Sequence, residues 1–209
     1  MTEKKKQQLK KEVKEINDIL LLAQEALKIV GYLSEEDDEI SYLKKANEFF
    51  GFTLIVYWRV IVIELSKLFG ERETEHFNIH KFISKLKRSG HYRDAKISAE
   101  KIAAWENEIK KEKEIIENLL QQRDKIYAHT DRKHKEVLNK LSIKNFQRLV
   151  KIIQVIICTI YFDIFESAYL INEPIDSPVE KLKWIMNMVA QHKKSDAVVW
   201  EERKKRYKS

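Results

Sequence analysis

Glycine and proline are scarce in this chain, and this scarcity constrains its fold more than any other feature. Four glycines and two prolines occur in 209 residues, about 3% of the chain against a usual share of roughly 12%. Sandwiches and barrels made of strands need a turn every few residues, and their turns draw on these two residue types. Hydrophobic residues make up 44% of the chain and charged residues 35%, which suits long helices with one packed and one solvated face. We therefore expect an all-α protein.

Apolar residues spaced three and four apart predict an up-and-down bundle of five to six helices. Gly31, Gly70 and Gly90 stand where three of these helices would end. The clearest local signal is Ser177-Pro178-Val179-Glu180, which fits an N-cap, a proline at the first helical position and a capping box. The expected helices span residues 3–30, 41–69, 77–89, 94–128, 142–170 and the stretch that starts at Pro178. We expect one domain over residues 1–192 and a basic C-terminal tail over 193–209. Beyond His192 the tail is expected either to fray or to dock only through Val198, Val199 and Trp200.

The ends of the chain carry its net charge. Residues 1–15 hold six lysines against three glutamates, and residues 193–209 hold seven basic against three acidic residues, whereas the stretch between them is balanced. Basic ends of this kind contact the phosphates of RNA or DNA, or they simply keep a protein soluble. The sequence leaves both roles open.

Apolar run length and the N-terminal sequence favour a cytoplasmic protein without a membrane segment. The start, MTEKKKQQLKK, lacks the apolar stretch of a secretory signal. The longest apolar run, residues 49–63, contains Arg59 and is shorter than the roughly 20 residues that a bilayer span needs. Cys158 is the only cysteine, so an intrachain disulfide cannot form.

Several common catalytic signatures are absent from the sequence. It has no glycine-rich phosphate loop and no dinucleotide-binding fingerprint, and one cysteine cannot build a paired-cysteine zinc site. His76 and His80 are four residues apart and could present two metal ligands on one helical face, but the HExxH arrangement is missing. We therefore expect neither a metal nor a cofactor.

The most informative segment is Arg123-Asp124-Lys125-Ile126-Tyr127-Ala128-His129-Thr130-Asp131. Helical spacing places Arg123 in line with Leu119 and Ile126 on an apolar face. A guanidinium there needs an anionic partner or a cleft, and Asp124, Asp131 and Glu64 are the candidates for an internal ion pair. On an ideal helix Arg123 and His129 differ by about 120° and about 9 Å. They converge only if the helix ends near Ala128 or if a second copy of the chain supplies the partner.

This segment resembles the signature of HEPN domains, in which a polar residue follows an arginine and four to six residues lie between the arginine and a histidine. Five residues separate Arg123 from His129 here. The longer pattern Arg-Asp-Lys-x-x-Ala-His-x-Asp resembles the AbiU-type, abortive-infection branch of that superfamily. Trp58-Arg59, the following Leu-Phe-Gly and the apolar stretch from Ile79 to Leu86 also suit that branch. The resemblance covers most of residues 10–170.

The resemblance implies a HEPN-like helical bundle that dimerises along the motif helix. It implies a metal-independent endoribonuclease of a toxin–antitoxin or phage-defence (antiviral) system, with RNA as substrate and an antitoxin or defence component as a further partner. Arg123 and His129 would be the catalytic pair, meeting their copies in a composite cleft, and Asp124 the polar residue that follows the arginine. The alternative that stays open is a non-catalytic HEPN-like dimeric scaffold that binds a nucleotide or a partner protein.

Tyr127 and Asp131 are supporting candidates whose roles are less defined. Some HEPN toxins carry a tyrosine two residues after the histidine, where an antitoxin modifies it, but that position here is Asp131 and the tyrosine precedes the histidine. This departure puts that control mechanism in doubt. Tyr127 can also be a partly buried helix residue, and Asp124 and Asp131 can be helix-end caps or members of surface ion pairs.

Overall fold

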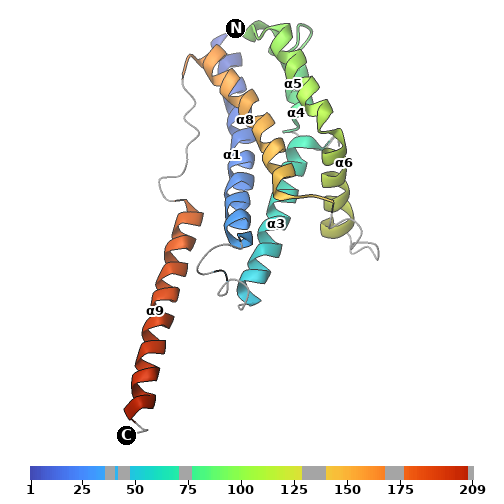
Figure 1. The fold of residues 1–209 in the computed structure, drawn as a ribbon. Coiled ribbons are helices and arrows are strands. Elements are labelled where there is room, and N and C mark those ends of the chain that lie inside the picture. Colours follow the sequence, from blue (N-terminus) through green and yellow to red (C-terminus); the bar gives the residue numbers. More distant parts are fainter. Residues whose placement is uncertain (36–40, 42–47, 71–76, 129–139, 168–176, 207–209) are drawn as a thin grey trace.

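The computed structural model describes residues 1–35, 41, 48–70, 77–128, 140–167 and 177–206, and every regular element among these residues is a helix. The predicted all-α class is therefore confirmed. Figure 1 shows a bundle of antiparallel helices from which the last helix projects. The helices are α1 (Glu3–Ser34), α3 (Glu48–Phe69), α4 (Ile79–Leu86), α5 (Ala99–Lys111), α6 (Lys113–Gln122), α8 (Ile143–Phe165) and α9 (Pro178–Arg206), with short turns η1 (Arg93–Ala95) and η2 (Arg123–Ala128).

Helix α1 forms the centre of the bundle, packing along α3 and contacting α8 and α9. Its inward side carries apolar residues at helical spacing that are almost completely buried, including Leu9, Ile16 and Leu20. Leu65 of α3 and Leu119 of α6 complete this core from the neighbouring helices. Burying each such side chain contributes roughly 1.5–3 kcal/mol, so packing on α1 stabilises the positions of α3, α8 and α9.

Two of the predicted glycine stops are wrong. Gly31 lies inside α1, which continues to Ser34. A glycine inside a helix costs roughly 1 kcal/mol relative to alanine, and burial of Tyr32 and Leu33 just beyond it outweighs that cost. Helix α4 ends at Leu86, before Gly90. Gly70, in contrast, follows the last residue of α3 as predicted.

The single long helix expected over residues 94–128 is divided into four pieces. Lys96 adopts a left-handed backbone with φ 58°, which separates η1 from α5. The hydroxyl of Ser98 then caps α5 by accepting from the Lys101 N–H at 3.3 Å. Glu112 interrupts the helix again, between α5 and α6. From Arg123 the backbone widens into the π-helical turn η2.

Helices α8 and α9 begin where the sequence predicted. Ser142 caps α8 in a capping box with Asn145, whose side chain accepts from the Ser142 N–H at 2.8 Å. Helix α8 ends at Phe165 rather than near Leu170, because Glu166 turns left-handed with φ 51°. The hydroxyl of Ser177 donates to Glu25 of α1 at 3.0 Å, tying the start of α9 to the bundle.

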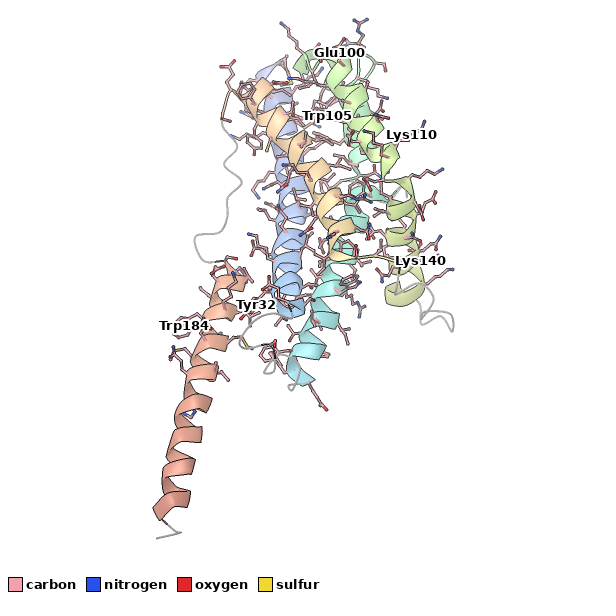
Figure 2. All side chains as sticks on the ribbon, in the orientation of Figure 1. Tyr32, Glu100, Trp105, Lys110, Lys140 and Trp184 are labelled. Carbon is pink, nitrogen blue, oxygen red and sulfur yellow. The ribbon has the colours of Figure 1, made fainter. Side chains whose placement is uncertain are left out.

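Helix α9 packs on the bundle through residues of its first half. Val179, Met186 and Ala190 form a small apolar cluster with Tyr32 and Leu33 at the end of α1. The helix then runs past the expected boundary at residue 192 to Arg206 and beyond the ends of α1 and α3 (Figure 1). Its backbone therefore does not fray at His192, and the side chains of the expected docking residues, Val198, Val199 and Trp200, lie outside the described part of the chain. Its other face carries four exposed apolar side chains, those of Trp184 (Figure 2), Ile185, Met188 and Val189.

The two halves of α3 differ in burial. The second half lies in the core, whereas the first half exposes Phe49, Phe52, Ile55 and Val56, which are 63%, 65%, 66% and 39% exposed. We call these four residues the α3 apolar strip. By length and composition alone α3 could also cross a membrane, so the expected absence of a membrane segment stays a prediction.

Candidate active site

The described part of the motif lies where α6 passes into η2. Arg123 caps α6, and its backbone N–H bonds to the carbonyls of Leu119 and Leu120. Its side chain is only 16% exposed, as expected for a residue on the apolar stripe. Arg123 Nε donates to Asp124 Oδ1 at 2.8 Å. This charge-assisted hydrogen bond orients the guanidinium plane.

Asp124 is therefore one of the anionic partners that the sequence offered for Arg123. Glu64 is engaged elsewhere, because both of its carboxylate oxygens accept from Lys67 Nζ, at 2.6 and 2.7 Å. Asp131 lies outside the described residues. The side chain of Asp124 is 39% exposed, so the pair reaches from the half-buried guanidinium toward solvent.

His129 also lies outside the described residues, as does the side chain of Tyr127. The backbone that leads to them is informative. Regular α-helix ends at Gln122, and residues Arg123–Ala128 form a π-helical turn, which changes the angle between Arg123 and the residues that follow it. Ideal α-helical spacing therefore does not hold within Arg123–Ala128. Turns of this type are concentrated at functional sites.

Gln122 is a feature of this region that the sequence reasoning missed. Its side chain is fully buried, and neither its nitrogen nor its oxygen has a hydrogen-bond partner within the described part of the chain. Burying such an amide without partners costs roughly 1–3 kcal/mol. The signal was available, since Gln122 stands three residues after Leu119 and four before Ile126, on the same apolar stripe. Because this burial is unfavourable, apolar packing alone does not explain why a glutamine occupies position 122.

Helix α3 borders the motif. It contacts both α6 and η2, and α6 runs antiparallel to it in Figure 1. Arg59 of α3 and Lys125 of η2 are both exposed. Within η2, Arg123 and Lys125 are basic and Asp124 is acidic, so the described turn of the motif carries one net positive charge.

A cavity of about 560 Å³ lies elsewhere, between α1, α8 and α9. Its lining includes Lys28, which pairs with Glu25 at 2.9 Å, and Lys183, which pairs with Glu180 at 2.7 Å. Its lining also includes Glu35, Glu180 and Lys151, so the cavity carries charges of both signs. It contains no motif residue.

The described residues contain no group of three or more histidine, cysteine or acidic side chains that could hold a metal ion. His76 lies outside the described residues, and His80 stands in the first turn of α4. The expectation that the protein needs no metal or cofactor stays a prediction.

No family model, curated protein or solved structure matches this chain. The likeness to HEPN proteins therefore rests on the Arg123–His129 segment and on the helical elements that precede it. Both the family and the activity that it implies remain proposals, supported by the motif and its surroundings.

Proposed function

We propose that this protein is a metal-independent endoribonuclease, acting in defence or growth arrest, whose cleft is shared by two copies of the chain. The observation that carries the proposal is the half-buried Arg123, held by Asp124 at the start of a π-helical turn, with His129 six positions further along the sequence. A guanidinium fixed in this way is suited to binding a phosphate group.

The chemistry requires only the RNA and these side chains. The 2′-oxygen attacks the neighbouring phosphorus, the P–O5′ bond breaks, and the products carry a 2′,3′-cyclic phosphate and a 5′-hydroxyl. Histidine is the side chain that moves protons most readily near neutral pH, so His129 would take the proton from the 2′-hydroxyl or supply one to the leaving oxygen. Arg123 would stabilise the charge that develops on the non-bridging phosphate oxygens, while Asp124 keeps the guanidinium oriented.

The α3 apolar strip supports a second copy of the chain as partner. Four neighbouring apolar side chains are exposed on one helix, and contiguous apolar patches of this kind mark interaction sites. Each fully buried phenylalanine contributes roughly 150–250 Å², against the roughly 800 Å² that each partner of a stable interface buries. Because α3 contacts η2, a copy seated on this strip would bring two motif segments close together.

The deciding experiment is cleavage of total RNA in EDTA by the wild-type protein and by the variants His129→Ala and Arg123→Ala. We expect cutting by the wild type with cyclic-phosphate ends. The histidine variant should lose activity by about 10²–10⁴-fold and the arginine variant by about 10²–10³-fold. Circular dichroism and light scattering must show that both variants stay folded and keep the wild-type oligomeric state. Equal cutting by all three proteins would overturn the proposal.

The second candidate is a non-catalytic scaffold that binds a nucleotide or a partner protein. It is favoured by the Arg123–Asp124 pair itself, because a neutralised arginine can be structural or can hold an anion without cutting it. Binding of RNA or of a partner that survives unchanged in both variants, together with absence of cleavage by the wild type, would establish this candidate in place of the nuclease.

A further inference from the structure

We propose that the cavity between α1, α8 and α9 binds an extended segment of a partner protein, about five residues long and with an acidic side chain at its centre. The cavity has a volume of about 560 Å³, within the range of roughly 300–1,000 Å³ that is usual for ligand pockets. It contains no residue of the Arg123–Asp131 motif, so the inference is independent of the proposed nuclease.

Two polar stripes form the long walls of the cavity. On α1 the stripe consists of residues at helical spacing, Gln24, Lys28 and Gly31. On α8 the corresponding stripe has the same spacing and consists of Gln147, Lys151 and Gln154. The two helices contact each other and run antiparallel (Figure 1), so the stripes follow the cavity along its length.

The length of these walls favours a linear ligand. On α1 the lining extends from Gln24 to Glu35, which is about 16 Å along the helix axis. On α8 it extends over the same number of positions, from Ile143 to Gln154. An extended chain rises about 3.3 Å per residue, so about five residues span this distance. A cavity of this form suits an extended peptide better than a compact molecule.

Carboxamide groups on both walls match a peptide backbone. Gln24 and Gln154 are half-buried and Gln147 is exposed, and these three side chains have no hydrogen-bond partner within the described part of the chain. Each carboxamide offers two N–H donors and an oxygen acceptor, and each peptide unit of an extended segment has an N–H and a carbonyl to pair. The buried residues Leu27 and Val150 also line the cavity and give it apolar surface for a side chain of the segment.

Gly31 keeps the cavity open. It lies inside α1, where a glycine costs roughly 1 kcal/mol relative to alanine. A Cβ atom at this position would meet no atom within 4 Å, so close packing does not require the glycine. Because Gly31 lines the cavity, a larger side chain would take up space that the ligand needs.

Lys151 determines the charge of the segment. The other two lysines of the lining, Lys28 and Lys183, are paired with glutamates at 2.9 and 2.7 Å. Lys151 is exposed and has no ion pair within the described residues. It lies near the middle of the α8 wall, so a carboxylate at the centre of the segment would pair with it. Glu35, at one end of the cavity, disfavours a second acidic residue there.

The test begins with an array of individual synthetic pentapeptides, which is probed with the fluorescein-labelled full-length protein. We expect binding to be concentrated in peptides with aspartate or glutamate at the central position. The strongest binder is then synthesised with a fluorescein label, and its dissociation constant is measured by fluorescence anisotropy. A second peptide with asparagine in place of the central acid measures how much the charge contributes.

Two substitutions in the cavity should weaken this binding. Gly31→Leu fills part of the cavity and should raise the dissociation constant by about tenfold or more, as for a central interface position, while circular dichroism shows that the protein stays folded. Lys151→Gln should raise it by about tenfold, as expected for loss of a hydrogen bond to a charged group. It should also remove the difference between the acidic peptide and the asparagine peptide.

Two matched controls should leave the affinity unchanged. Gly51→Leu also replaces a glycine inside a helix, and a Cβ there likewise meets no atom within 4 Å, but Gly51 lies on α3 and does not line the cavity. Lys110→Gln also removes an exposed lysine, from α5 (Figure 2), outside the cavity.

Three results would overturn the inference. The first is an array in which no peptide binds the wild type more strongly than Gly31→Leu. The second is binding that is unchanged in both Gly31→Leu and Lys151→Gln, which would place the peptide elsewhere. The third is binding of AMP or inorganic phosphate that Lys151→Gln abolishes, without binding of any peptide, which would make the cavity a site for small anions. RNA cleavage is measured separately, so none of these results removes the proposed function.

Discussion

Two buried polar side chains, those of Tyr92 and Gln122, differ in whether they form hydrogen bonds. Tyr92 is completely buried, and its hydroxyl donates to Glu12 Oε1 at 2.8 Å, while Lys85 Nζ contacts the other oxygen of Glu12 at 2.9 Å. Gln122 is just as buried and has no hydrogen-bond partner in the described part of the chain. The first residue stabilises the fold, whereas the second costs stability beside the candidate site.

Replacing Tyr92 by phenylalanine should lower the free energy of unfolding by about 1–3 kcal/mol, because Glu12 would lose a donor in a half-buried position. Urea unfolding followed by circular dichroism would measure the change. Asp94→Asn is a suitable control, since Asp94 makes an exposed contact with Lys5 at 3.2 Å and such pairs contribute about 0–1 kcal/mol. Equal stability of the Tyr92 variant and the wild type would contradict the prediction.

The same tyrosine predicts a dependence of stability on alkaline pH. Burial, and then the hydrogen bond and negative charge of Glu12, raise the pKa of Tyr92 above its ordinary value of 10.0. The unfolded chain therefore loses this proton at a lower pH than the folded chain does, so the stabilisation is complete below about pH 10 and declines above it. In Tyr92→Phe this contribution is absent, and thermal unfolding across that range should show a shallower decline than in the wild type. If the stability of both proteins declined equally with pH, Tyr92 would be excluded as the source of the decline.

Gln122→Met should raise the free energy of unfolding by about 1–3 kcal/mol, because a side chain of similar length replaces an amide that is buried without partners. If the amide serves the site, RNA cleavage should fall in the same variant, as in other trade-offs between stability and function. Ser66→Ala is the matched control, since the Ser66 hydroxyl is also buried without a partner in the described residues. It should gain stability and keep cleavage. A loss of stability in Gln122→Met would show that the amide is needed for packing.

Sequence spacing was sufficient to place Arg123 and insufficient to explain Gln122. The stripe through Leu119 and Ile126 predicted a half-buried guanidinium with an anionic partner, and the structure supplies Asp124. The π-helical turn that begins at Arg123 could not be predicted, because the apolar spacing through Leu119, Arg123 and Ile126 is that of a regular helix. The convergence of Arg123 with His129 stays a prediction.

At the scale of single helices, the ends that carry a polar cap were predictable and the interruptions were not. Ser142 and the Ser177-Pro178 pair mark starts that the structure reproduces. The breaks at Lys96 and Glu112 contain neither glycine nor proline, so composition gave no sign of them. The break at Glu112 separates α5, which contacts α8, from α6, which contacts α3.

Gly90 and Gly31 should respond in opposite ways to substitution by alanine. A Cβ atom at Gly90 would overlap the backbone carbonyls of Lys85 and Ser84, whereas a Cβ at Gly31 would meet nothing nearby. Gly90→Ala should therefore lower the free energy of unfolding by about 2–3 kcal/mol. Gly31→Ala, inside α1, should raise it by about 0.5–1 kcal/mol through helix propensity. Chemical denaturation of the two variants and the wild type measures both changes in the free energy of unfolding. Changes of the same sign in the two variants would contradict this prediction.

At the scale of the whole molecule, the packing is incomplete at one end. The first half of α3 and the outer face of α9 both expose apolar side chains there, although their inner faces share a cluster with the end of α1. A single chain thus leaves exposed more apolar surface than isolated side chains would explain. The α3 apolar strip belongs to a helix that contacts η2, the turn of the motif. If a second copy of the chain covers this strip, two motif segments come close together.

Phe52→Glu tests whether a second copy covers the α3 apolar strip. Phe52 is 65% exposed at the middle of the strip. A charge there should raise the dimer dissociation constant by about 30-fold or more, the effect of losing a central interface residue. Phe162→Glu on α8 is the matched control, since Phe162 is even more exposed, at 74%, and lies outside the strip. Light scattering over a concentration series should give a dimer for the wild type and the control, and a monomer for Phe52→Glu.

The result also separates a protein interface from a lipid-binding face. If the wild type is monomeric at all concentrations and binds anionic vesicles through the same strip, the length and apolar composition of α3 reflect a membrane contact. The shared cleft would then be excluded, because one chain provides a single Arg123. If instead Phe52→Glu is a folded monomer that also loses RNA cleavage while Phe162→Glu keeps it, catalysis requires the dimer. That dependence is expected only where both copies contribute to one site.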